Sequence, residues 1–114
     1  MTKNYKEIVA EISASLSTMG QGIPEVMSKF HALGQAATKD GALNKKTKEL
    51  IALALAVAAR CDGCIGFHTQ TLINLGVTKE EFLETLSMAI YMGGGPSVIY
   101  STEALRAFEQ LKGA

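Results

Sequence analysis

Apolar residues recur every three or four positions along most of this chain, which is the spacing of one face of an α-helix. The first such segment covers residues 4–18, and we expect the glycines at positions 20 and 22 to end its helix. Its apolar positions are Tyr5, Ile8, Val9, Ile12 and Leu16. A second helix is predicted over residues 24–37, because Pro24 suits a first helical turn and an apolar stripe follows it.

Four further helices are predicted from their end signals as well as from their periodicity. Asn44 is a suitable N-cap, Gly76 is a suitable stop, and Thr78 with Glu81 has the spacing of a capping box. The predicted ranges are residues 44–60, about 62–75, 78–92 and 97–112. No stretch alternates between apolar and polar residues as a half-buried strand would. The predicted fold class is therefore all-α, with about six helices.

The apolar run of the third predicted helix, residues 50–59, reads LIALALAVAA and offers no polar face. Such a helix is normally buried on every side, and a chain of 114 residues has few elements with which to surround it. We therefore expect a homo-oligomer whose partner chains complete the fold. The run is about half of the roughly 20 residues that a bilayer span needs, so no membrane association is expected.

Length and composition restrict the function classes. A chain of 114 residues without an obvious linker is expected to form one domain over residues 1–114. It is 47% hydrophobic and 19% charged, which is enough apolar material for a core. Eleven basic and eleven acidic residues give a formal net charge of zero, which argues against nucleic-acid binding. Residues 1–11 lack the apolar centre of a signal peptide, so we expect a cytoplasmic protein.

Candidate chemistry gathers around the two cysteines of the chain, Cys61 and Cys64. On a helix, residues 61, 64 and 68 project from one face, so both thiols lie near the imidazole of His68. A helix that begins near Asp62 places Cys64 in its first turn, where the helix dipole favours a thiolate. His68 can accept the proton of Cys64, and Cys61 can resolve an oxidised Cys64. These features indicate reversible thiol chemistry in a reducing compartment.

Glu49 joins this group if the third and fourth helices are antiparallel. The third helix runs about 15 Å from Glu49 to the turn near residue 60, and the fourth returns about 9–10 Å to His68. The remaining axial gap is about one helical turn. Glu49 could then orient His68, which gives a predicted proton relay from Glu49 through His68 to Cys64.

These residues resemble a known family in both identity and spacing. Glu49, the Cys61-x-x-Cys64 pair and His68 precede Gly76, Glu80-Glu81 and the Gly-Gly-Pro at positions 94–96. This pattern is similar to that of the alkyl hydroperoxidase D-like family, also called the carboxymuconolactone decarboxylase family, over roughly residues 24–111.

The resemblance implies an all-helical subunit that assembles into trimers or hexamers and acts as a cysteine-based peroxidase on a hydroperoxide substrate. By this resemblance Cys64 attacks the peroxide, Cys61 is the resolving cysteine and proton donor, and Glu49 and His68 form the proton relay. An external dithiol or redox protein then reduces the disulfide, and neither a cofactor nor a bound metal is implied. Well-studied hydroperoxidase members carry a histidine immediately before the second cysteine, where this chain has Gly63.

Three alternatives remain open at the level of sequence. Two thiolates, an imidazole and a carboxylate could hold zinc. The family's second name points to decarboxylation of a muconolactone carboxylate, although members with that activity generally lack the cysteine pair. Cys61 and Cys64 could also be buried small apolar residues in a non-catalytic oligomeric module. The second histidine, His31, stands alone in the second predicted helix and is interpreted as an ordinary helix-face residue.

Overall fold

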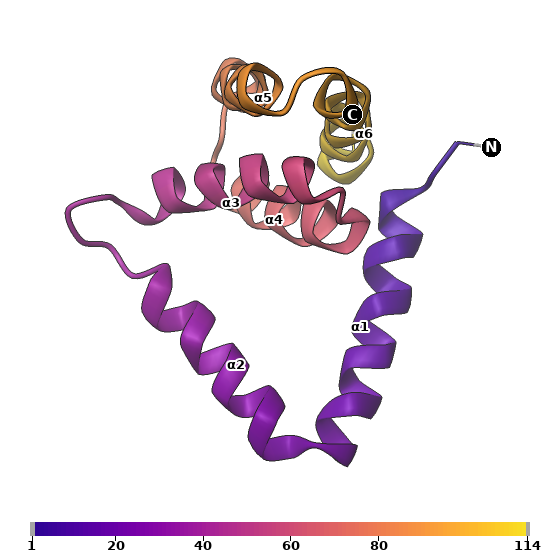
Figure 1. Cartoon of the computed structure of the whole chain (residues 1–114). Helices are drawn as coiled ribbons and strands as arrows, with labels where there is room; N and C mark the ends of the chain where they lie inside the picture. Colours follow the sequence, from indigo (N-terminus) through magenta and orange to yellow (C-terminus); the bar gives the residue numbers. More distant parts are fainter. Residues whose placement is uncertain (1, 114) are drawn as a thin grey trace.

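The computed structural model describes residues 2–113 of the chain, and all regular secondary structure in this range is helical, which confirms the predicted all-α class. Six helices follow one another with short connections (Figure 1). They are α1 (Tyr5–Gly22), α2 (Pro24–Ala37), α3 (Lys45–Ala59), α4 (Asp62–Asn74), α5 (Lys79–Gly93) and α6 (Gly95–Lys112).

The helix ends follow the local chemistry of the sequence with two differences. Asn44 caps α3, and Thr78 and Glu81 form the predicted capping box of α5. The first helix, however, continues through both glycines to Gly22, because a glycine inside a helix lowers stability by only about 1 kcal/mol and does not stop it. The sixth helix begins two residues earlier than predicted, at Gly95, because Gly94 adopts a positive φ of 70° and completes the break alone.

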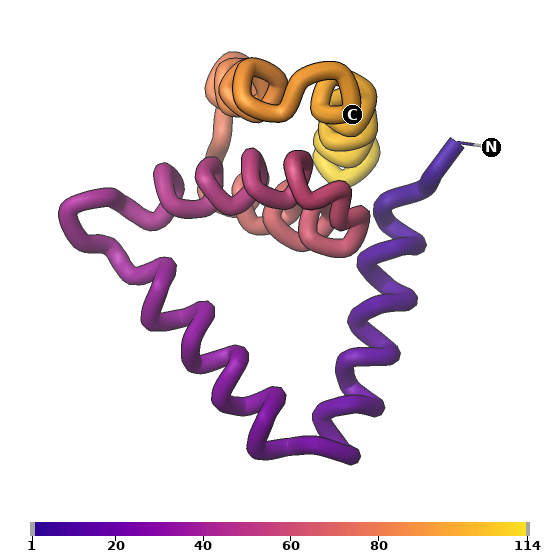
Figure 2. Tube along the Cα trace, in the orientation of Figure 1, coloured from indigo at the N-terminus to yellow at the C-terminus, as the bar shows by residue number. Residues whose placement is uncertain are grey.

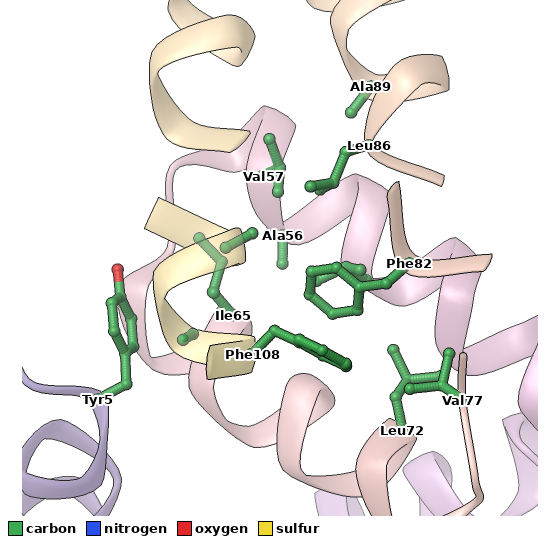
Figure 3. Close-up of a cluster of buried hydrophobic side chains, with 13 residues drawn as sticks. Tyr5, Ala56, Val57, Ile65, Leu72, Val77, Phe82, Leu86, Ala89 and Phe108 are labelled. Atoms are coloured by element: carbon green, nitrogen blue, oxygen red, sulfur yellow. The ribbon is translucent and has the colours of Figure 1, made fainter. Parts of the chain in front are cut away.

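Helices α3 to α6 enclose the main hydrophobic core. Leu53 and Val57 of α3 are fully buried against side chains from the three following helices, and the rings of Phe82 and Phe108 lie 4.8 Å apart between centroids. Figure 3 shows these two rings at the centre of the cluster, with Tyr5 of α1 at its margin. The packing of this core positions helices α3 and α4 side by side.

Helix α1 lies against α4, where two glycines leave room for it. A β-carbon added at Gly66 would lie 2.7 Å from Val9 Cγ2, and one added at Gly63 would lie 2.7 Å from Ile12 Cδ1. The absence of side chains at these two positions therefore allows α1 to cover one side of the helix that carries the cysteines.

Polar contacts fasten the start of α1 to α4 and α6. Lys3 Nζ lies 2.9 Å from Asp62 Oδ2, and this hydrogen bond raises the pKa of Lys3. The backbone N–H of Tyr5 donates to Gln110 at 2.7 Å, and the Tyr5 hydroxyl donates to Glu103 at 3.0 Å. Burial, and after it the hydrogen bond to Glu103, raises the pKa of Tyr5. The N-terminal segment is thus held by α6 and by Asp62, which lies between the two cysteines.

Helix α2 stands apart from the core and packs only against α1 within the described chain. Figures 1 and 2 show α1 and α2 as two arms that meet at residue 23 and close a triangle with α3. None of the residues of α2 is buried, and Val26 and Leu33 are 61% and 62% exposed. Helix α3 is likewise buried on only one side, because Leu55 on its other side is 65% exposed.

No helix within residues 2–113 combines the length and the apolar character that crossing a membrane requires.

The packing of α1 against α4 can be tested at Gly66. We expect Gly66→Ala to destabilise the fold by about 1–3 kcal/mol, because the new methyl group overlaps Val9, whose β-branched side chain has little rotamer freedom in a helix. Denaturant unfolding followed by circular dichroism measures this free energy.

Gly20→Ala is the matched control, because it adds the same methyl group to an α1 glycine with nothing within 4 Å. It should stabilise the protein by about 0.5–1 kcal/mol through helix propensity. Equal effects of the two substitutions would show that α1 does not pack closely on α4.

Candidate active site

A two-residue connection, Arg60 and Cys61, sets the relative position of α3 and α4. Arg60 follows α3 and adopts the left-handed conformation, with φ 57° and ψ 48°. Its N–H donates to Val57, and the N–H of Cys61 donates to Ala56, so the last carbonyls of α3 are satisfied within the turn. The chain reverses at once, and α4 runs back along α3 with the cysteines at the turn.

The reversal brings Glu49 of α3 and His68 of α4 into direct contact. His68 Nδ1 lies 2.7 Å from Glu49 Oε1, although the two residues are 19 positions apart. The side chain of Glu49 is only 5% exposed, whereas that of His68 is 35% exposed. A carboxylate only accepts hydrogen bonds, so Nδ1–H of His68 donates to Glu49 and Nε2 is left for a second partner. The pair thus has a buried acceptor and a solvent-accessible ring.

Cys61 and Cys64 lie at the N-terminal end of α4 and form a disulfide. Cys61 is the N-cap of the helix, and Cys64 belongs to its first turn. The backbone N–H of Cys64 donates to Cys61 Sγ at 3.2 Å, so the sulfur takes the place of the usual N-cap oxygen. Both cysteines are half-buried. The positive end of the helix dipole therefore acts on both sulfurs.

His68 lies one helical turn after Cys64 on α4, which places both side chains on the same side of the helix. The structure therefore joins Glu49 to His68 by a hydrogen bond and Cys61 to Cys64 by a disulfide. One turn of α4 separates the two pairs.

A cavity of about 560 Å³ adjoins the Glu49–His68 pair on the side that faces α2. It is bounded by all of the first four helices, and its lining includes His31 and Lys45 as well as Glu49 and His68. Sequence reasoning missed the first two of these residues. The apolar stripe of α2 gave no sign that Met27 and Phe30 within it line a cavity together with the histidine of another helix, since this depends on the angle between α1 and α2.

Among residues 2–113, no three histidine, cysteine, aspartate or glutamate side chains come close enough to hold a metal ion. The disulfide also occupies the two sulfurs that a zinc site would use.

Comparison with known proteins assigns the chain to a family. The model of the carboxymuconolactone decarboxylase family matches residues 24–107, which include Glu49, both cysteines and His68. The chain therefore belongs to the carboxymuconolactone decarboxylase family, and the resemblance seen in the sequence is confirmed.

Similar proteins cover nearly the whole chain. The crystal structure of a carboxymuconolactone decarboxylase family protein from Legionella pneumophila, in its apo form, has a TM-score of 0.93 at 59% identity over 95% of this chain and 96% of that chain. A family member from Thermotoga maritima, whose description suggests involvement in an antioxidative response, has a TM-score of 0.77 at 29% identity over 96% of this chain and 91% of its own. An uncharacterized protein from Cupriavidus necator is 42% identical over 97% of this chain and 98% of its own length.

The Glu49–His68 contact predicts coupled effects on stability. We expect His68→Ala to lower the free energy of unfolding by about 1–3 kcal/mol, because it leaves a buried carboxylate without its partner. Glu49→Met in the His68→Ala background should recover part of this loss, because it removes the unpaired charge. A double-mutant cycle by denaturant unfolding measures the coupling.

His31→Ala is the matched control, since no hydrogen bond or ion pair within residues 2–113 involves its ring. It should change the stability by less than about 0.5 kcal/mol. Strictly additive effects of the changes at positions 49 and 68 would contradict the contact.

Proposed function

We propose that this protein is a cysteine-based peroxidase that uses Cys64 and Cys61 as a redox pair and Glu49 with His68 as a proton relay. The observation that carries the proposal is the hydrogen bond from the imidazole of His68 to a buried carboxylate, one helical turn from a cysteine whose sulfur forms a disulfide. A base that is oriented by a third group beside a nucleophile is the general arrangement for activating that nucleophile.

In the first step the Cys64 thiol is oxidised by a hydroperoxide. His68 takes the thiol proton, and the thiolate attacks the terminal peroxide oxygen. The O–O bond breaks, a sulfenic acid forms on Cys64, and the leaving alkoxide takes up a proton and departs as an alcohol. Glu49 holds the ring of His68 in the orientation that this transfer needs, and it stabilises the imidazolium that forms in between.

In the second step Cys61 and Cys64 form the disulfide. The Cys61 thiolate attacks the sulfenic sulfur of Cys64, the S–S bond forms, and the sulfenic oxygen leaves as water once it has gained a proton. In the third step an external dithiol transfers two electrons and two protons to the disulfide, which restores both thiols and leaves the reductant as a disulfide. The 3-residue separation of the cysteines requires no large backbone movement for this cycle.

The N-terminal end of α4 supports both halves of this cycle. The helix dipole favours negative charge on either sulfur, and the Cys64 N–H is directed at Cys61 Sγ. This hydrogen bond favours the Cys61 thiolate as the attacking group in the second step. It also favours the same thiolate as the leaving group when a reductant attacks Cys64.

Gly63 takes the position at which well-studied hydroperoxidase members have a histidine. In this chain a β-carbon at position 63 would lie 2.7 Å from Cδ1 of Ile12, so a larger side chain there would require the end of the Ile12 side chain to move. We propose that His68 alone serves the proton transfers here. We also propose that the reductant reaches the half-buried cysteines from the side that α1 does not cover. A reducing compartment such as the cytoplasm would supply that dithiol.

We also propose that the protein acts as a homo-oligomer, a trimer or a hexamer. Large apolar side chains are exposed on five helices, among them Val26 on α2, Leu55 on α3, Met92 on α5 and Ile99 on α6. Such a surface on a small chain is typical of contacts between copies.

The redox proposal predicts different defects for the two cysteines. Cys64→Ser should reduce the consumption of hydrogen peroxide or cumene hydroperoxide to the uncatalysed background. Cys61→Ser should still form a sulfenic acid on Cys64 in one turnover but should not form the disulfide. Peroxide loss and mass spectrometry of the dimedone adduct check both statements on the reduced, metal-free protein.

Unchanged peroxide consumption in Cys64→Ser would remove this residue from the mechanism. A reduced wild-type protein that forms neither sulfenic acid nor disulfide with either peroxide would refute the peroxidase proposal as a whole.

The assembly proposal predicts a particle mass of three or six chains by light scattering. Combined Val26→Asp and Leu33→Asp substitutions should lower this mass, because they place charges on the unburied face of α2. Lys29→Gln on the same helix should leave it unchanged, since Lys29 lies in an exposed pair with Glu25. A monomeric wild-type protein would contradict the proposal.

A further inference from the structure

The cavity beside the Glu49–His68 pair has the size and the lining of a site for a small organic molecule. Its volume of about 560 Å³ falls within the range of ordinary ligand pockets. Its apolar wall comes from three helices and consists of Leu16, Met27, Phe30 and Phe67. An apolar wall beside an acid–base pair is of no use for hydrogen peroxide, which has no carbon chain to bury.

The polar groups of the cavity differ in their partners. Its single carboxylate, Glu49, accepts a hydrogen bond from the ring of His68. Lys45, at the rim, forms no ion pair or hydrogen bond through its ammonium within residues 2–113. Its neighbours differ, because Lys46 pairs with Glu81 at 2.8 Å and Lys48 donates to a backbone carbonyl at 2.7 Å.

Asp40 lies beside Lys45 but forms no ion pair with its ammonium within residues 2–113. The carboxylate of Asp40 accepts the backbone N–H of Lys45 at 2.7 Å and so caps the helix. His31 faces the same cavity from α2 and adds a second hydrogen-bond donor. Lys45 is therefore the one lysine or arginine of the lining, and its ammonium is the group that can pair with an anionic head at the rim.

The ammonium of Lys45 and the sulfur of Cys64 lie at different positions along the α3–α4 hairpin. Lys45 lies one turn before Glu49 on α3, and Cys64 lies one turn before His68 on the antiparallel α4. Each turn rises about 5–6 Å and about one more turn separates Glu49 from His68 along the helix axes, so Lys45 and Cys64 lie about 17 Å apart along the hairpin, with the Glu49–His68 pair between them.

We propose that this cavity binds the organic part of an amphipathic hydroperoxide that carries a carboxylate, such as a fatty-acid hydroperoxide. The carboxylate lies at Lys45, the alkyl chain lies along the apolar wall, and the peroxide group is presented to Cys64 beside His68. This assignment rests on the proposed peroxidase function for its catalytic meaning, but the binding itself does not require any turnover.

Binding is tested with decanoate and with decanol on the oxidised protein, in which no thiol chemistry can occur. By isothermal titration calorimetry, Lys45→Gln should weaken decanoate about three- to tenfold, the loss expected for one partly exposed charge-assisted contact, and should leave decanol within twofold. Added salt should likewise weaken decanoate only. Lys29→Gln, on α2 but outside the cavity, should change neither ligand.

Catalysis is tested separately, with a fatty-acid hydroperoxide and with its methyl ester as oxidants of the reduced protein. Lys45→Gln should slow disulfide formation with the acid about three- to tenfold and leave the ester and hydrogen peroxide unchanged.

The outcomes separate the two proposals. Absence of saturable decanoate binding, or equal binding by wild type and Lys45→Gln, would overturn the inference and assign the cavity to packing against a second copy. Rapid oxidation of Cys64 by hydrogen peroxide in that case would leave the peroxidase proposal standing. Lys45-dependent decanoate binding by a protein that is inert to every peroxide would support the site while refuting the peroxidase function.

Discussion

The burial of one carboxylate organises the candidate site. Glu49 lies on the buried side of α3, where an unpaired charge would be strongly unfavourable, and His68 is the partner that the fold supplies. The contact is possible only because the two-residue connection of Arg60 and Cys61 makes α4 return directly along α3. The same turn leaves the cysteines at the N-terminal end of α4, so the geometry that satisfies the acid also places the base one turn from Cys64.

A second constraint is the close approach of α1 to α4. The glycines at positions 63 and 66 lie where Ile12 and Val9 cross, and the Lys3–Asp62 pair fastens the start of α1 beside the cysteines. At position 63, between the cysteines, a larger side chain would have to displace the end of the Ile12 side chain. Helix α1 thus covers one side of the cysteine pair.

On the other side of the site the fold is open. Helix α2 contacts only α1 within the described chain, so the space between α2 and the α3–α4 hairpin is a cavity rather than core. One wall of this cavity is the acid–base pair and another is apolar. In the proposed mechanism this arrangement separates three tasks among three places: redox chemistry at the helix end, proton transfer in the middle of the hairpin, and ligand contacts along the arm.

The sequence by itself determined the six helices, because periodicity and capping are local properties that few residues decide. It also predicted that Glu49 would meet His68, since rise per residue fixes where two antiparallel helices coincide. It misjudged the end of α1, because the glycines at positions 20 and 22 do not stop that helix. The exposed side of α3 in the single chain leaves its predicted burial to partner chains, and so to the proposed oligomer. Only the tertiary structure decided that His31 and Lys45 share a cavity with the relay, since the angle between α1 and α2 arises from packing between distant segments, which no local pattern records.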